Sequence, residues 1–521
     1  MRGISALLAA LACATSLCAA PMARVAGGAL SGIVTPTQPG VSAFLGIPFA
    51  APPIGTLRWA APKPAARWQG VRAADRFGAR CMQPTLYPDQ RFRSAGMSED
   101  CLSLNVWAPA DARRASKLPV LVYIYGGGFQ TGDGSEYRYD GASLAAGGIV
   151  VVTINYRLGA FGFLAHPALT AEAGASGNYG LLDQAAALRW VRANIAAFGG
   201  DPRHVTVGGE SAGSMSVSAL MAAPMTRKLI AGAIGESGAV LGPTQQLASL
   251  AKAEGAGARF AEGLGATSAA ALRAVPAEAI LAAQRASRDA TFGPIIDGRM
   301  IVEDPTATFL AGHEAHVPLL VGSNSEERGA AATLGTDPAS VAGYRAALVR
   351  LYGARAGTIE ELFPAAGDAD VLPAATELSS ERFLAHTTWR WMDLHRRTGA
   401  PTFYYRYDRV RPAALDATWR PKVDPIGAVH SSELEYALGN LEYAAAYAWT
   451  DADRAVSTTM RGYWLAFVKT GNPNSGGVPS WKAEPASGEA TTRHRIGDIV
   501  VDEPFAAQSR ESALTELLPP R

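Results

Sequence analysis

The stretch of residues 204–214, HVTVGGESAGS, decides the fold class of this chain. Residues 204–207 predict a short strand, residues 208–213 a turn, and residues 214–221 the start of a helix. The turn holds a G-x-S-x-G pattern, which predicts a nucleophile elbow when it stands between a strand and a helix. In such an elbow a strained backbone lifts the serine hydroxyl above the sheet edge, and the flanking glycines let neighbouring backbone approach. Ser211 is therefore the candidate nucleophile.

The segments around this turn alternate between strand-like and helix-like patterns. Residues 118–125, LPVLVYIY, and residues 148–155, GIVVVTIN, are apolar runs that predict strands buried on both faces. Residues 181–198 carry apolar side chains at helical spacing and end at Gly199 and Gly200. The alternation predicts the α/β class, with a central, mostly parallel sheet flanked by helices.

The glycines that follow the first of these strands are candidates for binding an oxyanion. Gly126, Gly127 and Gly128 can supply backbone N–H donors from a tight bend. The helix after Ser211 begins with free N–H groups aimed at the same place. Gly127, Gly128 and Ala212 are the predicted donors, and an ordinary glycine-rich loop is the alternative.

The chain has eight histidines, and their positions in the sequence distinguish the candidate catalytic base from the others. His430 follows a strand-like segment at 401–407 and a Pro/Gly loop, and it comes last in the serine, acid, histidine order of folds built on this elbow. It is the candidate base. His386 and His395 lie on an amphipathic helical stretch, 381–397, where packing or solvent-facing roles are more common.

Two further histidines, His313 and His316, form an H-x-x-H pair. Neither a third ligand nor an H-E-x-x-H context accompanies them. The sequence therefore predicts no metal site.

The acid of such a triad should follow a strand between the nucleophile and the histidine. Residues 317–321, VPLLV, predict a strand that leads into a loop containing Glu326 and Glu327. From this pattern alone, either carboxylate can orient His430.

Composition narrows the classes of function. A chain of 521 residues with 48% hydrophobic content can bury a large core, and no linker divides it. We predict one catalytic domain at 24–521 with large loop and helical insertions. The formal net charge is +1 and the 47 basic residues are spread along the chain, so nucleic-acid binding is not expected.

Residues 1–23 have the pattern of a signal peptide, with an apolar run at 4–17 followed by small residues. We expect a secreted or periplasmic protein after its removal. Cys13 and Cys18 raise a lipid anchor as the alternative, although neither follows a good lipobox. No later run reaches about 18 uninterrupted apolar residues, so no integral membrane segment is expected.

Signal removal leaves two cysteines, Cys81 and Cys101, on either side of a polar loop. An even pair in an oxidising compartment predicts a disulfide bond. Two buried free thiols are the alternative.

Several long motifs extend the elbow into a family pattern. They are residues 198–214 with the sequence FGGDPRHVTVGGESAGS, residues 99–106 with EDCLSLNV, and residues 427–434 with GAVHSSEL. Shorter matches lie in order at 46–50, 155–159 and 177–184. Together they resemble the type-B carboxylesterase/lipase family, the esterase branch of the α/β-hydrolases that is related to the cholinesterases. The resemblance runs from about residue 28 to residue 482.

This resemblance implies an α/β-hydrolase fold and a serine carboxylesterase. Such an enzyme hydrolyses a small to medium carboxylic ester through an acyl-serine intermediate, without a metal or organic cofactor. The family pattern makes Glu327 the acid and His430 the base, with Glu326 as the alternative acid, and it matches the Cys81–Cys101 disulfide loop. The resemblance makes Ser237 and Glu210 candidates for supporting the triad, although Glu236 stands where the family usually has glutamine before that serine.

The chain departs from the family pattern at charged positions. Arg328 stands where the family commonly has glycine after the acid. The loop between Cys81 and Cys101 lacks the tryptophan that a cholinesterase needs for its cation, and instead holds Arg91 and Arg93. If these arginines face the site, esters bearing a carboxylate should be favoured over quaternary ammonium esters. The alternative is that the arginines are solvated or paired with nearby acids, namely Asp89, Glu99, Asp100 or Glu326.

Three other functions remain compatible with these motifs. A catalytically inactive binding protein can share the fold, and a peptidase or a lipase can share the triad chemistry. The natural ester and the oligomeric state are not readable from the motifs, because substrate pockets are built from loops.

Overall fold

The computed structural model describes residues 20–287, 292–415, 424–488, 492–505 and 508–518. Among these residues, the main sheet has 11 strands in the order β16-β15-β14-β13-β10-β9-β7-β8-β6-β4-β3. The strands are β3 (Ile33–Val34), β4 (Val41–Pro48), β6 (Ser103–Pro109), β7 (Leu118–Ile124), β8 (Val150–Ile154), β9 (Gly200–Glu210), β10 (Gly232–Glu236), β13 (Leu319–Asn324), β14 (Thr402–Tyr407), β15 (Thr492–Ile496) and β16 (Val501–Pro504). From β8 to β15 every neighbouring pair is parallel, whereas the pairs at both edges are antiparallel. The predicted mostly parallel sheet is confirmed.

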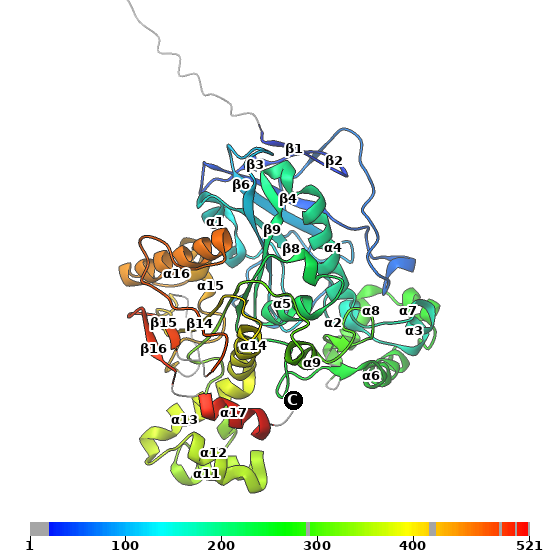
Figure 1. The fold of residues 1–521 in the computed structure, drawn as a ribbon. Coiled ribbons are helices and arrows are strands. Elements are labelled where there is room, and N and C mark those ends of the chain that lie inside the picture. The colour runs from blue at the N-terminus through cyan, green and yellow to red at the C-terminus, as the bar shows by residue number, and fades with distance from the viewer. Residues whose placement is uncertain (1–19, 288–291, 416–423, 489–491, 506–507, 519–521) are drawn as a thin grey trace, which may run out of the picture.

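Helices cover the faces of this sheet, and further helices lie outside it (Figure 1). They are α1 (Ala142–Ala146), α2 (Gly159–Phe163), α3 (Pro167–Ala173), α4 (Tyr179–Asn194), α5 (Ala212–Ala222), α6 (Leu250–Gly263), α7 (Ala269–Ala274), α8 (Ala277–Ala286), α9 (Pro305–Leu310), α10 (Ala331–Leu334), α11 (Val341–Tyr352), α12 (Ala356–Leu362), α13 (Asp368–Ser380), α14 (His386–Arg396), α15 (Leu434–Ala437), α16 (Asp451–Thr470) and α17 (Gln508–Leu517).

The predicted elements are present, with shifted ends. The strand predicted at 204–207 extends over Gly200–Glu210, because its N-terminal end pairs with Leu118 at the start of β7. The helix predicted at 181–198 begins earlier, as α4, and its last turn tightens to a 3₁₀ turn at Ile195–Phe198. Gly199 ends that turn with a φ of +86°, a conformation that costs glycine little.

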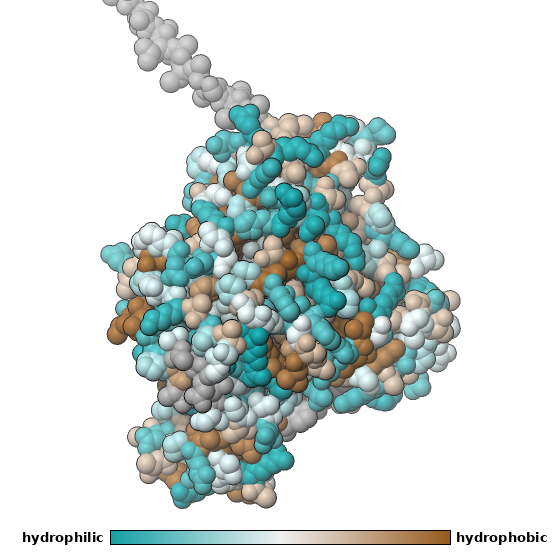
Figure 2. Space-filling model, in the orientation of Figure 1, coloured by the Kyte–Doolittle hydropathy of each residue, from teal (hydrophilic) through white to brown (hydrophobic). Residues whose placement is uncertain are grey.

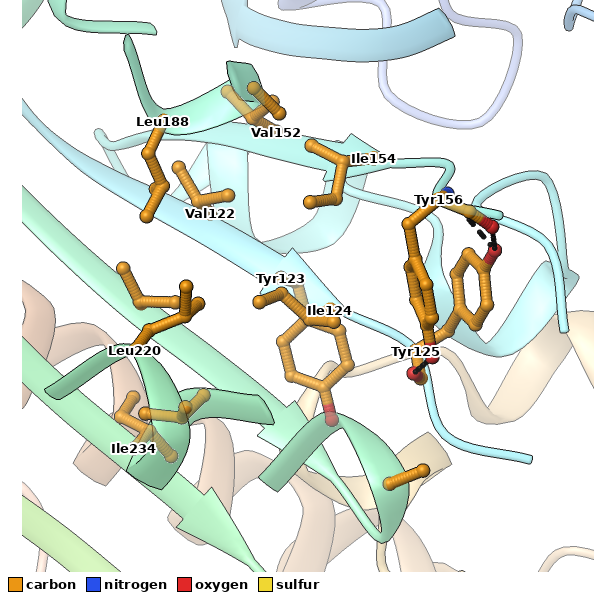
Figure 3. Packing of buried hydrophobic residues seen from close by; sticks show 14 of the residues in the cluster. Val122, Tyr123, Ile124, Tyr125, Val152, Ile154, Tyr156, Leu188, Leu220 and Ile234 are labelled. Atoms are coloured by element: carbon orange, nitrogen blue, oxygen red, sulfur yellow. Dashed lines mark hydrogen bonds between the residues drawn. The ribbon is translucent and has the colours of Figure 1, made fainter. Parts of the chain in front are cut away.

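The core forms where α4 and α5 cover the central strands. Val122 of β7 and Ile234 of β10 are fully buried, as is Leu220 of α5. Figure 3 shows these side chains together with Leu188 of α4 in one apolar layer. Burying one such aliphatic side chain contributes roughly 1.5–3 kcal/mol, so this layer holds β9 and α5 in a fixed relation. The elbow between them is thereby supported from below.

A second, smaller hydrophobic cluster lies outside the sheet, in helices α10 to α13 and α17. In Figure 1 these helices form a lobe at the end of the molecule away from the N-terminal strands. The helical stretch predicted at 381–397 joins this lobe to the sheet as a π-helical turn, Glu381–Ala385, which continues into α14. On the face shown in Figure 2, hydrophobic residues appear in small groups between hydrophilic ones.

The N-terminal strands form a separate small sheet, β1 (Met22–Val25), β2 (Gly28–Ser31) and β5 (Val71–Ala73). Residues 1–19 of the predicted signal segment, 1–23, lie outside the described residues. The last two residues of that segment, 22 and 23, belong to β1.

Within the described part of the chain, no helix combines the length and apolar character that crossing a membrane requires. A third, two-stranded sheet among the described residues pairs β11 (Ala248–Ser249) with β12 (Ile295–Ile296).

The predicted disulfide is present. Cys81 and Cys101 are joined by an S–S bond of 2.02 Å, and their Cα atoms lie 5.0 Å apart. Both cysteines are buried. The bond therefore ties the loop between them to the segment that enters β6.

Candidate active site

Ser211 occupies a strained turn between β9 and α5. Its φ of 56° and ψ of −122° are rare for a residue with a side chain. The flanking glycines permit this turn, because a Cβ on Gly213 would lie 2.0 Å from the Ile124 carbonyl oxygen and one on Gly209 would lie 2.6 Å from the backbone of Gly213. The predicted elbow geometry is confirmed.

The structure brings the three predicted triad residues together in one chain of contacts. Nε2 of His430 lies 2.9 Å from Oγ of Ser211. Nδ1 of the same ring lies 2.6 Å from Oε2 of Glu327. Glu327 follows β13, whereas His430 lies in the segment between β14 and α15, so three distant parts of the sequence meet at the sheet edge.

The neighbouring carboxylate, Glu326, is turned away from the histidine. Its Oε2 accepts backbone hydrogen bonds from Ile426 at 2.7 Å and Gly427 at 2.9 Å. Glu327 is instead held by Ser237, whose hydroxyl donates to its Oε1 at 2.5 Å, and by the N–H of Asn324 at 2.7 Å. The contact predicted for Ser237 is therefore present.

Glu210 supports the histidine from a second direction. Its Oε1 lies 3.2 Å from Nε2 of His430 and accepts a hydrogen bond from the Ser431 hydroxyl. Burial lowers the pKa of His430, but the charges of Glu210 and Glu327 outweigh burial and raise that pKa to about 9. Burial raises the pKa of Glu210, against the opposing charge of His430. The two carboxylates thus stabilise a positive charge on the imidazole.

The predicted oxyanion donors lie beside the serine. Gly127, Gly128 and Ala212 line the same cavity as Ser211. Ala212 is the first residue of α5, where backbone N–H groups have no partner within the helix. Gly127 cannot be replaced without strain, because it has a φ of +105° and a Cβ there would lie 2.1 Å from the Thr131 carbonyl oxygen.

A pair of tyrosines holds the strand that leads into this glycine loop. Tyr125 donates to the carbonyl of Tyr156 at 3.2 Å, and Tyr156 donates to the carbonyl of Tyr125 at 3.0 Å. Their rings stack against each other (Figure 3), and the ring centroids lie 4.5 Å apart. The glycines therefore leave β7 from a rigid base.

The cavity above the serine has a volume of about 540 Å³, which suits a small-molecule ligand. Most of the residues that line this cavity were not predicted from the sequence, because they come from segments far apart in the chain. Its lining outside the predicted site includes Tyr87, Gln90, Phe129, Arg138, Met215, Gln245, Phe383 and Leu384. Tyr87 and Gln90 carried the one available signal, since both lie in the disulfide loop where the cholinesterase tryptophan is absent.

The three arginines singled out from the sequence have different surroundings. Arg328 is exposed and lines the cavity. Arg93 does not, because its guanidinium donates to Asp140 at 2.7 Å and to the Ser135 carbonyl at 2.8 Å. Arg91 is exposed but is not among the lining residues. The hypothesis that all three face the site is therefore wrong for Arg91 and Arg93. Arg93 is paired, as the alternative held, but its partner Asp140 is none of the acids considered.

One group of residues has the spacing of metal ligands. Ligand atoms of Glu381, His386 and Glu511 lie within 4.8 Å of one another, and all three residues are buried. Nη2 of Arg510 lies 3.4 Å from Glu511 and 3.6 Å from Glu381. Because this guanidinium already balances the buried carboxylates, we assign no metal to the group.

Comparison with known proteins adds the family to this geometry. The model of the carboxylesterase family matches residues 19–498. The chain belongs to the carboxylesterase family. This carboxylesterase is 38% identical to the para-nitrobenzyl esterase of Bacillus subtilis (strain 168) over 464 residues, which cover 86% of this chain and 90% of the relative. It is 36% identical to the fumonisin B1 esterase of Sphingopyxis macrogoltabida over 474 residues, 89% of this chain and 85% of the relative.

Solved structures agree with this assignment. A PNB esterase superposes on the carboxylesterase with a TM-score of 0.77 at 34% identity, covering 95% of this chain and 99% of that chain. A thermophilic PNB esterase gives 0.78 at 33% identity with the same coverage. The carboxylesterase therefore has the predicted α/β-hydrolase fold and is a carboxylic ester hydrolase, not merely a binding protein built on that fold.

Proposed function

We propose that Ser211, His430 and Glu327 form the catalytic triad of this esterase. The observation that carries the proposal is the unbroken chain of contacts at 2.9 Å and 2.6 Å that joins the three side chains at the floor of one cavity. Glu327 accepts the Nδ1–H of His430 and leaves Nε2 free to take a proton. We further propose that the backbone N–H groups of Gly127, Gly128 and Ala212 form the oxyanion hole.

In the acylation half of the mechanism, Oγ of Ser211 attacks the ester carbonyl carbon while Nε2 of His430 accepts the hydroxyl proton. The carbonyl oxygen becomes negative and accepts hydrogen bonds from the oxyanion-hole N–H groups. Glu327 and Glu210 stabilise the imidazolium formed at this stage. When the carbon–oxygen bond breaks, His430 protonates the departing alcohol and the acyl group remains on Ser211.

In the deacylation half, water replaces the alcohol and His430 accepts one of its protons. The resulting hydroxide attacks the acyl carbon, the bond to Ser211 breaks, and the serine recovers its proton from the imidazole. The products are a carboxylic acid and an alcohol, and the enzyme returns to its starting state. Water is the only co-reactant that the proposed mechanism requires.

The proposed substrate is a small to medium carboxylic ester. The cavity volume of about 540 Å³ and the apolar side chains of Phe129, Met215, Phe383 and Leu384 support this size and class. A hydrolysis panel of 4-nitrophenyl and naphthyl esters of graded acyl length, with a matched anilide, tests the proposal. We expect turnover of the short and medium esters and little of the anilide. Preferential cleavage of the anilide or of long-chain esters would instead favour a peptidase or a lipase.

We also propose that the chain is exported and acts in the periplasm or outside the cell. The pattern of residues 1–23 and the Cys81–Cys101 disulfide support this location. N-terminal sequencing of the protein recovered from the periplasm and medium tests it. An intact Met1 on active protein found only in the cytoplasm would contradict export, whereas a lipid-modified cysteine at the N-terminus would indicate the anchored alternative.

A further inference from the structure

Arg328 places a positive charge inside the active-site cavity, one residue beyond the triad acid. Its backbone is held by Ser380, whose hydroxyl oxygen lies 3.3 Å from the Arg328 N–H and 3.4 Å from its carbonyl oxygen. Its side chain is exposed. A fixed backbone with a solvent-accessible guanidinium is suited to meeting a ligand that enters the cavity.

One aromatic ring separates this guanidinium from the catalytic base. The guanidinium carbon of Arg328 lies 5.3 Å from the ring centroid of Phe383. The same ring packs edge-on against His430, with centroids 5.2 Å apart. Phe383 therefore contacts both the guanidinium and the imidazole, which places the positive charge of Arg328 near the reaction centre.

The other arginine of this cavity has its charge already balanced. Arg138 is buried, pairs with Glu136, and lies 3.3 Å from Asp89. For Arg328, in contrast, no carboxylate of the described segments lies within ion-pair distance. Its planar set of N–H donors is thus available to a ligand, and that set matches a carboxylate in a bidentate manner.

Tyr87 borders the same space from the oxyanion side. A Cβ built on Gly128 would lie 3.8 Å from the Tyr87 hydroxyl. Burial and the charge of Glu210 raise the pKa of Tyr87, while the charge of Arg328 acts in the opposite direction. The phenol therefore remains a hydrogen-bond donor at neutral pH, within the electrostatic reach of Arg328.

We propose that Arg328 binds a carboxylate of the substrate, so that the preferred substrates are esters that also carry a carboxylate group. Tyr87 is the candidate second donor. The inference rests on the proposed ester hydrolysis and specifies its substrate class. Recognition is local, because the chain has a net charge of only +1 and the cavity also holds Asp89 and Glu210. Direct pairing, and not long-range steering, gives the preference.

Two matched substrate pairs test this assignment. Mono-4-nitrophenyl glutarate against 4-nitrophenyl pentanoate places the carboxylate on the acyl side. Butyryloxybenzoate against butyryloxybenzamide places it on the alcohol side. We expect a kcat/KM roughly 10-fold higher for the anionic member of at least one pair, the size of a partly exposed charge-assisted hydrogen bond. High salt should reduce this ratio.

Variants then assign the preference to one side chain. Arg328→Gln should lower the anionic-to-neutral ratio to near one, and Arg328→Lys should retain part of it, because lysine keeps the charge without the planar fork. Arg382→Gln is the matched control, since it removes the arginine next to Phe383 in the sequence, which packs over Tyr352 outside the cavity lining. The control should keep the wild-type ratio.

The two proposals fail in distinguishable ways. A wild-type enzyme that hydrolyses the neutral esters but shows no anionic preference, or one whose preference survives Arg328→Gln, overturns the carboxylate site alone. A folded wild-type enzyme that hydrolyses neither member of either pair overturns the proposed function, the hydrolysis of small to medium esters.

Discussion

Two clusters in this molecule have the same composition, one histidine and two glutamates, and very different surroundings. In the first, His430 lies 2.6 Å from Glu327 and 3.2 Å from Glu210. In the second, His386 lies 2.9 Å from Glu511 with Glu381 close by. The first adjoins Ser211 and the active-site cavity, whereas the second joins α14 to α17 beside the helical lobe.

The two environments shift the pKa values of the two histidines in opposite directions. The side chain of His430 is 23% exposed, and its two glutamates raise its pKa to about 9. The side chain of His386 is fully buried, and this burial lowers its pKa to about 4. The charge of Arg390 also lowers the pKa, whereas the charge of Glu381 acts in the opposite direction. A histidine beside carboxylates is thus a poor indicator of a catalytic base, and contact with a nucleophile in a cavity is a better one.

The largest expected effect follows from removing the nucleophile of the first cluster. Ser211→Ala should lower kcat by roughly 10⁴- to 10⁶-fold, because residues of a triad act as a unit. His430→Ala should lose a similar amount. Steady-state hydrolysis of a 4-nitrophenyl ester measures the loss, and circular dichroism verifies folding. Ester turnover by Ser211→Ala at the wild-type rate would show that the nucleophile is another residue.

Replacing Glu327 and its sequence neighbour Glu326 one at a time tests which of the two carboxylates orients His430. Glu327→Gln should lower kcat by roughly 10⁴-fold, because the amide cannot hold the correct histidine tautomer or stabilise the imidazolium. Glu326→Gln is the matched control, and we expect a loss below about 10-fold, since within the described segments its carboxylate accepts hydrogen bonds from backbone N–H groups and does not contact His430. Equal losses in the two variants would contradict the assignment of Glu327 as the acid.

A smaller effect is expected on the pH profile when the second carboxylate is neutralised. Hydrolysis requires neutral His430, and the Glu210 charge raises the pKa of that histidine. Glu210→Gln removes the charge, so the pKa should fall and the acid limb of kcat/KM should move to lower pH. Stopped assays between acidic and alkaline pH measure the limb. A limb that stays in place or moves to higher pH would show that Glu210 does not act on the base.

The smallest catalytic effect is expected at the second cluster. His386→Ala should change kcat/KM by less than about threefold, yet lower the free energy of unfolding by about 1–3 kcal/mol, because it removes the hydrogen bond to Oε2 of buried Glu511. Urea denaturation measures the loss. His313→Ala, at an exposed position, is the control and should change neither quantity. A large loss of kcat in well-folded His386→Ala would break the distinction between the clusters.

Short-range patterns were enough to predict the elbow, its strand and helix, and the position of the candidate nucleophile. The reason is steric, since only glycine fits at 209 and 213, where a Cβ would collide with neighbouring backbone. The order of motifs along the chain likewise singled out His430 from the other histidines. Element ends were less predictable, because pairing with β7 extended β9 back to Gly200.

Long-range contacts decided the rest of the site. Whether Glu326 or Glu327 faces the histidine depends on where the segment at 426–427 lies, which no local pattern contains. The pairing of Arg93 with Asp140 and the meeting of Arg328 with Phe383 join residues 47 and 55 positions apart, respectively. Local sterics and periodicity are encoded within a few residues, but the burial and charge balance of a side chain are set by whichever distant segments pack around it.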